Sequence, residues 1–135
     1  MKDTDIVGIE RFLDEMKVDV EEDKLDAVET RRFWLLSEAI TVDKNLFIVE
    51  AIIGVFIGRF GRIVEVLEPT NESGIIEEKK AKKLLQRARE AVTDVITLSK
   101  DYLRYGDTVK FLNAVAHVYY TLQEVTETLR LEVEM

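Results

Sequence analysis

The sequence "AKKLLQRAREAVTDVITLSKDYLRYGDTVKFLNAVAHVYYTLQEVTETL" (residues 81–129) contains two apolar repeats separated by one break. Apolar residues recur in both repeats at steps of three and four, which is the spacing of one face of an α-helix. The break is Gly106 followed by Asp107, a pair that is typical of a helix C-terminus and of the cap of the next helix. This stretch therefore predicts a long antiparallel helical hairpin with a tight turn.

Each predicted helix of the hairpin carries an apolar row. The row of the first helix, over about 76–105, is Ala81, Leu84, Ala88, Val92, Val95, Ser99 and Tyr102. The row of the second helix, over about 107–131, is Leu112, Val115, Tyr119, Leu122, Thr126 and Leu129, at steps of 3, 4, 3, 4 and 3. A row with heptad-like spacing packs along a neighbouring helix at a shallow angle. We therefore predict that the second row, including Leu112 and Leu122, is buried against a neighbour.

The N-terminal half shows three further helical patterns, over about 4–17, 23–40 and 46–67. In the second of them, Trp34 and Leu36 are expected to widen the apolar stripe. The stretch "EPTNESG" at 68–74 combines Pro, Asn, Ser and Gly, which are residues that favour turns, and it predicts a loop.

The predicted fold is all-α: a four- to five-helix bundle that forms a single domain over residues 1–135. Its N-terminal helices cover about 4–67, and its long C-terminal antiparallel hairpin covers about 75–131. A chain of this length is one domain by ordinary size. One proline and six glycines also supply too few turn signals for a domain made of many short strands.

The most apolar segment runs from Leu46 to Phe60 and includes Gly54 and Gly58, which form a G-x-x-x-G motif. It is only 15 residues long and contains Glu50, whereas a membrane-spanning helix needs about 20 apolar residues. We therefore predict a helix that is buried in the protein and no membrane segment. The β-branched residues leave one alternative open, a pair of strands that turn near Gly58–Gly61.

The composition limits the function classes. The chain has no cysteine, which excludes disulfides and thiolate metal sites and fits a reducing, cytoplasmic location. The net charge is −8, of which residues 1–30 contribute −7 with 4 basic and 11 acidic side chains. An acidic chain is a poor non-specific binder of DNA, and the basic stretch 77–90 lacks the interleaved aromatic residues that stack on RNA bases. We predict no DNA, RNA or membrane partner; the basic stretch is solvated or docks on the acidic N-terminal region.

Four residues are candidates for a ligand site: Glu50, Arg59, Arg62 and His117. Glu50 lies among apolar residues and is expected to pair with an arginine, because a buried carboxylate is costly alone. Arg59 and Arg62 stand beside glycines in "GRFGR", an arrangement able to hold an anion. His117, the only histidine, lies about 200° around its helix from Tyr119 and so away from the apolar row. We predict no metal, cofactor or catalytic group, since only carboxylates remain as metal ligands.

The stretch "YLRYGDTVKFLNAV" (102–115) resembles an archaeal family of short helical proteins, the domain of unknown function 357 family. The matching residues are Tyr102, Leu103, Gly106, Asp107, Val109, Leu112, Ala114, Val115 and Leu122. The family's next polar pattern would fall on 117–123, where this chain instead reads "HVYYTLQ". The resemblance implies a helical hairpin and no chemistry.

The same stretch is similar to the last helices of HEPN nuclease bundles. The ribonuclease signature of that family is an arginine followed closely by a histidine on one helix. The nearest arginine before His117 is Arg104, thirteen residues earlier and on the other side of Gly106. This resemblance therefore implies the helical bundle without the nuclease activity.

These observations favour a non-catalytic helical module for protein–protein interaction or scaffolding. The predicted helix over 76–105 would be about 45 Å long, whereas the radius of gyration of a compact chain of this size is about 14 Å. We therefore expect a second copy or another protein partner to cover an exposed part of the hairpin. The alternative is a small enzyme or an anionic-ligand binder that uses Glu50, Arg59, Arg62 and His117, and one concave pocket shared by all four would favour it.

Overall fold

The computed structural model describes residues 3–42, 44–73 and 78–134. Within these ranges the chain forms five α-helices and no strand. The helices are α1 (Asp3–Glu21), α2 (Leu25–Val42), α3 (Lys44–Ser73), α4 (Glu78–Tyr105) and α5 (Thr108–Glu134). The predicted all-α bundle is confirmed, and residues 46–67 belong to one helix rather than to a pair of strands.

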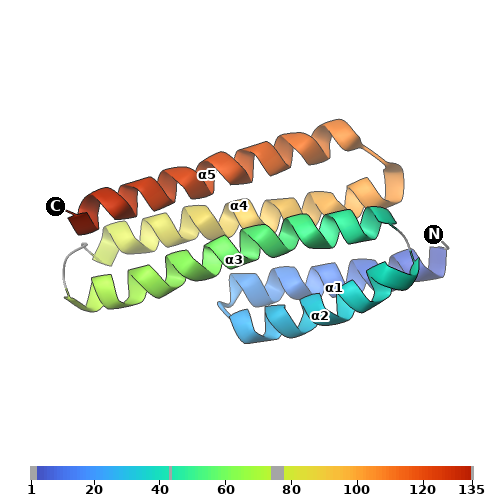
Figure 1. Ribbon diagram of the computed structural model, residues 1–135, viewed down its shortest axis with the longest axis horizontal. Helices are drawn as coiled ribbons and strands as arrows, with labels where there is room; N and C mark the ends of the chain where they lie inside the picture. Colours follow the sequence, from blue (N-terminus) through green and yellow to red (C-terminus); the bar gives the residue numbers. More distant parts are fainter. Residues whose placement is uncertain (1–2, 43, 74–77, 135) are drawn as a thin grey trace.

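Helix α4 is the centre of the bundle (Figure 1). It packs against α1, α3 and α5, while α2 packs against α1 and α3. The three long helices α3, α4 and α5 run the length of the molecule, and the α1–α2 hairpin lies beside only one half of it, on the right in Figure 1. Because α4 is antiparallel to α3 and to α5, these two helices run in the same direction.

The turn between α4 and α5 has the predicted local structure. Gly106 adopts a φ of 70°, a left-handed conformation that favours glycine, and its N–H donates to the carbonyl of Tyr102 at 2.8 Å. Asp107 caps α5, because its Oδ1 accepts a hydrogen bond from the N–H of Lys110 at 3.1 Å. The rings of Tyr102 and Phe111 stack across the turn with their centroids 4.5 Å apart. The tight helical hairpin is therefore confirmed.

The buried row of α5 differs from the predicted one. Its members are Phe111, Val118, Leu122, Val125 and Leu129. Leu122 and Leu129 were predicted correctly, but Leu112 is 56% exposed, Tyr119 is 46% exposed and Thr126 is also exposed. Residues 111, 118 and 125 repeat at sevens, and so do 112, 119 and 126, so both rows have the spacing of a helix seam. The row that starts at Phe111 packs against α4, and the row that starts at Leu112 therefore lies on the side of α5 next to α3.

Helix α3 continues through Pro69 to Ser73. The predicted loop at 68–74 is therefore wrong for residues 68–73, and residue 74 lies outside the described residues. A proline removes the N–H donor that would bond to the carbonyl four residues earlier, and the helix nevertheless continues for four residues after Pro69. The turn-forming residues around Pro69 therefore lie within α3 and do not end it, although their composition predicted a loop.

Helix α1 is longer than predicted because its apolar row continues. Val20 is fully buried at the helical spacing of the residues before it, and the helix ends at Glu21. Asp23 then adopts a φ of 57°, a conformation that Asp tolerates, and turns the chain into α2. On α2 the buried residues described are Val28 and Leu35, whereas Trp34 is 56% exposed. The prediction that Trp34 widens the packed side of this helix is therefore wrong.

Helix α3 buries one side in the bundle, while residues such as Ile48 and Val55 on its other side are exposed, so the predicted burial of the most apolar segment holds for one side only. Its buried apolar side chains are Leu46, Val49, Ile53, Phe56, Ile57, Phe60, Ile63 and Leu67. Helices α2, α4 and α5 all pack against it. Among the described residues, no helix has the length and apolar character needed to cross a membrane.

Candidate functional site

The four candidate residues lie in three places. Glu50 pairs with a residue of α2, Arg59 and Arg62 line a cavity between α3 and α5, and His117 is exposed on α5. His117 borders a shallow cleft on the α4 side of α5, which also includes Asp94. The structure therefore brings Arg59 and Arg62 together but separates them from Glu50 and His117.

Glu50 and Arg32 form an ion pair between α3 and α2. Glu50 is only 5% exposed, and its Oε1 accepts a hydrogen bond from Nη2 of Arg32 at 3.1 Å. Nη1 of Arg32 also donates to Oε2 of Glu29 at 3.0 Å. Gly54, one helical turn after Glu50, makes room for the guanidinium, because a Cβ at this position would lie 2.9 Å from Cζ of Arg32. The expected pairing of Glu50 with an arginine is confirmed, and the pair joins α2 to α3.

A cavity of about 440 Å³ lies between the C-terminal parts of α3 and α5. It is lined by Arg59, Arg62, Ile63, Val66, Thr126, Leu129 and Arg130, and we call it the arginine cavity. The guanidinium of Arg59 lies over the ring of Tyr119, with Cζ 5.3 Å from the ring centroid. The arginine cavity therefore combines positive charge with a largely apolar wall.

Two pairs of residues define the register of α3 against α5. Arg59 meets Tyr119, and seven residues further along each helix Val66 and Thr126 both line the arginine cavity. Because the two helices run in the same direction, equal steps along each of them stay level. The same register therefore places Leu112 of α5 level with residue 52 of α3.

Exposed apolar side chains extend from Tyr119 toward the N-terminal ends of α3 and α5. They are Ile48 and Val55 of α3 and Leu112 and Tyr119 of α5, and Val55 is 60% exposed. Ile48 and Val55 are seven residues apart, and Val55 is four residues before Arg59, so all three share the side of α3 that meets Tyr119. We call the four exposed apolar residues the apolar face.

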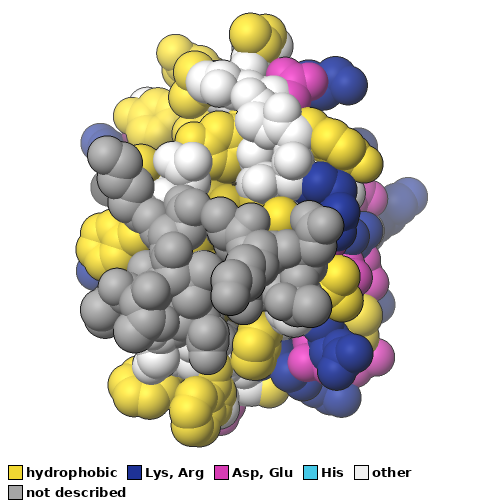
Figure 2. Space-filling model, turned by 90° about the vertical axis from the view of Figure 1, so that its right-hand side faces the viewer, with side chains coloured by type: hydrophobic (Ala, Val, Ile, Leu, Met, Phe, Trp, Pro, Cys, Tyr) yellow, Lys and Arg dark blue, Asp and Glu magenta, His cyan; other side chains and the backbone are white. Residues whose placement is uncertain are grey.

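The opposite side of the bundle, between α1 and α4, is held by ion pairs. They are Glu10–Arg104, Asp14–Lys100 at 2.5 Å and Asp23–Arg89 at 2.7 Å. In an end-on view, charged side chains gather on the right of the molecule and hydrophobic ones on the left and at the bottom (Figure 2). Arg89 thus docks a part of the basic stretch 77–90 on the acidic N-terminal region.

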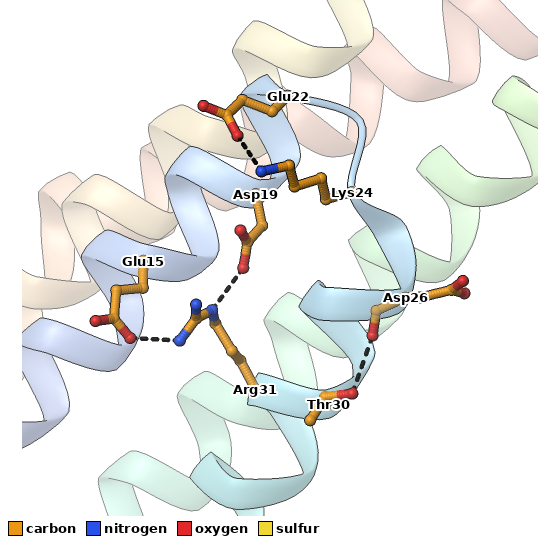
Figure 3. A network of polar contacts seen from close by, with 7 residues as sticks. All are labelled: Glu15, Asp19, Glu22, Lys24, Asp26, Thr30 and Arg31. Atoms are coloured by element: carbon orange, nitrogen blue, oxygen red, sulfur yellow. Dashed lines mark hydrogen bonds and ion pairs between the residues drawn. The ribbon is translucent and has the colours of Figure 1, made fainter.

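A second set of ion pairs joins α1 to α2 (Figure 3). Arg31 donates to Oδ2 of Asp19 at 2.5 Å and also to Oε2 of Glu15. The hydrogen bond to Asp19 raises the pKa of Arg31 above its usual value, so this side chain stays charged. Lys24 pairs with Glu22 at 2.8 Å in the turn between the two helices. The positive charges of this region are therefore neutralised within the chain.

Arg59 and Arg62 differ from the arginines of these networks. Neither has a carboxylate partner in the described parts of the chain. Arg59 has the ring of Tyr119 beside it, and Arg62 is exposed. In a chain with a net charge of −8, these two arginines beside an apolar wall thus have no acidic partner among the residues that the structure describes.

Sequence reasoning found Arg59 and Arg62 but missed the α5 side of the arginine cavity. The heptad spacing predicts that Thr126 is packed, whereas Thr126 lines the cavity from an exposed position. The sequence contains one signal for the α5 side of the cavity. Arg59 and Val66 are seven residues apart, and so are Tyr119 and Thr126, so each pair lies along one side of its helix.

Within the described residues, no group of three His, Cys, Asp or Glu side chains is placed to hold a metal ion. No protein-family model, no curated protein and no solved structure matches the chain.

Proposed function

We propose that the protein is a non-catalytic interaction module whose apolar face binds a second copy of the same chain. The observation that carries this proposal is the exposure of Ile48 and Val55 on α3 together with Leu112 and Tyr119 on α5. Single exposed apolar residues are normal on a protein surface, whereas a contiguous group on two adjacent helices is typical of an interaction site.

A second copy suits the apolar face because two identical apolar surfaces leave water when they pack against each other. Two copies related by a twofold axis would place α3 and α5 of one chain against α3 and α5 of the other, as a layer of four helices. If the two copies run in opposite directions, the pair Arg59 and Arg62 of each copy lies at opposite ends of the interface. The like charges then stay apart, which removes an electrostatic cost of association.

Sedimentation of wild-type protein and of two variants tests this proposal. We expect the wild-type chain to sediment as a dimer, and Val55→Asp and Leu112→Asp to sediment as monomers, because each places a charge in the apolar interface. Both residues are exposed, so neither change is expected to unfold the chain. Val7→Asp is the matched control, since Val7 is exposed on α1, outside the apolar face, and it should remain dimeric. A wild-type chain that is monomeric at every accessible concentration would contradict the proposal.

The alternative function loses its common pocket. A small enzyme using Glu50, Arg59, Arg62 and His117 needs the four side chains around one substrate. Glu50 instead pairs with Arg32, and His117 is exposed beside a different cleft. Only the anionic-ligand part of that alternative keeps support, from the cavity that Arg59 and Arg62 share.

A further inference from the structure

We infer that the arginine cavity binds a small amphiphilic anion, that is, a carboxylate or similar acidic group attached to a hydrocarbon chain. The two halves of this ligand correspond to the two parts of the lining. Arg59 and Arg62 of α3, together with Arg130 of α5, supply positive charge, and Ile63, Val66 and Leu129 supply the apolar wall. The cavity lies beyond Tyr119, toward the C-terminal ends of α3 and α5, and the inference does not depend on dimerisation.

The charge argument rests on the contrast between arginines. Arg31, Arg32 and Arg89 each form an ion pair with a carboxylate of the chain. Arg59 and Arg62 have no such partner within the described residues, although acidic side chains outnumber basic ones by 27 to 19. A guanidinium is weakly hydrated and binds a carboxylate through two parallel N–H donors. An external anion is thus the partner that these two side chains lack.

Tyr119 positions one of the two arginines. Its ring attracts the guanidinium of Arg59, which lies with Cζ 5.3 Å from the ring centroid. A ring in this position restrains the long side chain without supplying a carboxylate, so the N–H donors of Arg59 remain available to an anion. Restraint of this kind lowers the conformational entropy lost when a ligand binds.

The hydrocarbon part of the ligand is indicated by the rest of the cavity. Ile63 and Leu129 are buried, and Val66 is exposed at the margin. The volume of about 440 Å³ falls within the range of roughly 300–1,000 Å³ that is usual for sites of small ligands. Inorganic phosphate or acetate would use the arginines but leave the apolar wall uncovered, and a neutral alkyl chain would do the reverse.

Methyl NMR with three probes tests the inference. Sodium decanoate below its micelle concentration carries both parts of the proposed ligand, acetate carries the acidic group alone, and decyl maltoside carries the alkyl chain with a neutral head. We expect decanoate to shift the methyl signals of Ile63, Val66 and Leu129 in a saturable manner. Acetate and decyl maltoside should bind at least about tenfold more weakly, because each lacks one set of contacts.

Variants of the arginines provide the second arm of the test. Arg62→Gln should weaken decanoate binding about tenfold or more, as expected for the loss of a charged hydrogen bond, and the double variant Arg59→Gln with Arg62→Gln should abolish it. Arg11→Gln removes the same charge from an exposed position on α1 and should bind as the wild type does. Val66→Asp places a carboxylate one helical turn after Arg62, and it should block decanoate while the fold persists.

Three results would overturn the inference. The first is equal affinity of decanoate for the wild type and for the double variant. The second is equal binding of decanoate and decyl maltoside, which would indicate a site for alkyl chains of any kind. The third is binding to vesicles that contain phosphatidylglycerol without any binding of monomeric decanoate, which would indicate a membrane surface rather than a single ligand molecule as the source of the anion. Circular dichroism of each variant confirms that the fold is retained.

Discussion

The α1–α4 side and the α3–α5 side of the bundle differ in whether their charged side chains form ion pairs within the chain. On the first side, Asp14 pairs with Lys100 and Asp23 pairs with Arg89, so the chain neutralises its own charges. On the second side, Arg59 and Arg62 have no carboxylate partner within the described residues, and Val55 is exposed nearby. The contrast indicates that the first side completes the fold, while the second side is the one on which binding is to be sought.

The largest expected effect distinguishes the two heptad rows of α5. Leu122→Ala should lower the free energy of unfolding by about 2–5 kcal/mol, because the side chain is fully buried and its loss leaves a cavity. Leu112→Ala should lower it by less than about 1 kcal/mol, since Leu112 is largely exposed. Urea denaturation of both variants, at a protein concentration where the chain is monomeric, measures the difference. Equal losses would mean that α5 is rotated from the position described.

The next effect concerns the glycine beside the ion pair of Arg32. Alanine in place of glycine inside a helix usually stabilises it by up to about 1 kcal/mol. Gly54→Ala should instead destabilise the protein by about 1–3 kcal/mol, because the added Cβ collides with the guanidinium and breaks its hydrogen bond to Glu50. Gly58→Ala is the control on the same helix, since no atom lies within 4 Å of its Cβ position, and it should stabilise. Thermal melts that show the same sign for both changes would contradict this prediction.

A smaller effect compares arginines on the two sides of the bundle. Arg89→Gln should lower the free energy of unfolding by about 0.2–1 kcal/mol, the usual value for a solvent-accessible ion pair, because it breaks the contact with Asp23. Part of this loss should disappear at high salt, where the wild-type pair is itself screened. Arg62→Gln should leave stability unchanged, since it breaks no ion pair. Denaturation of both variants at low and at high salt measures the stability loss of each variant and its dependence on salt. A loss for Arg62→Gln as large as that for Arg89→Gln would contradict the proposed difference between the two arginines.

The smallest effect is expected at His117. His117→Gln should change the free energy of unfolding by no more than about 0.5 kcal/mol, because the residue is exposed and lies off the buried row. It should also leave the sedimentation of the protein unchanged. A thermal melt at neutral pH is sufficient for the comparison, and a loss similar to that of Leu122→Ala would identify His117 as a structural residue.

The fold was predictable where the signals were local. Gly106 and Asp107 carry the turn and the cap of α5 in their own residue types, and the apolar steps of 81–129 define two helices without reference to anything distant. The side of α5 that is buried could not be predicted from local signals. Phe111 and Leu112 start two parallel heptad rows, and only the packing of α4 decides which row is buried.

The candidate site was predictable only in part for the same reason. Arg59 and Arg62 stand out in the sequence, but the ring that meets Arg59 belongs to Tyr119, sixty residues later. The burial of Glu50 followed from its apolar neighbours, yet the choice of Arg32 among several arginines depends on the space at Gly54. Both facts depend on how two helices lie side by side, which no local pattern contains.

The unequal lengths of the helices have a consequence for internal motion. Helices α1 and α2 lie beside only one half of α3, α4 and α5 (Figure 1), and Asp23, in the turn that follows α1, pairs with Arg89 in the middle of α4. The bundle is thus thinner at the end that the α1–α2 hairpin does not cover. A thinner core opens locally at a lower free energy, so backbone amides at this end should exchange their hydrogens with solvent sooner. The arginine cavity lies at that end, where transient opening would admit a ligand without unfolding the rest of the bundle.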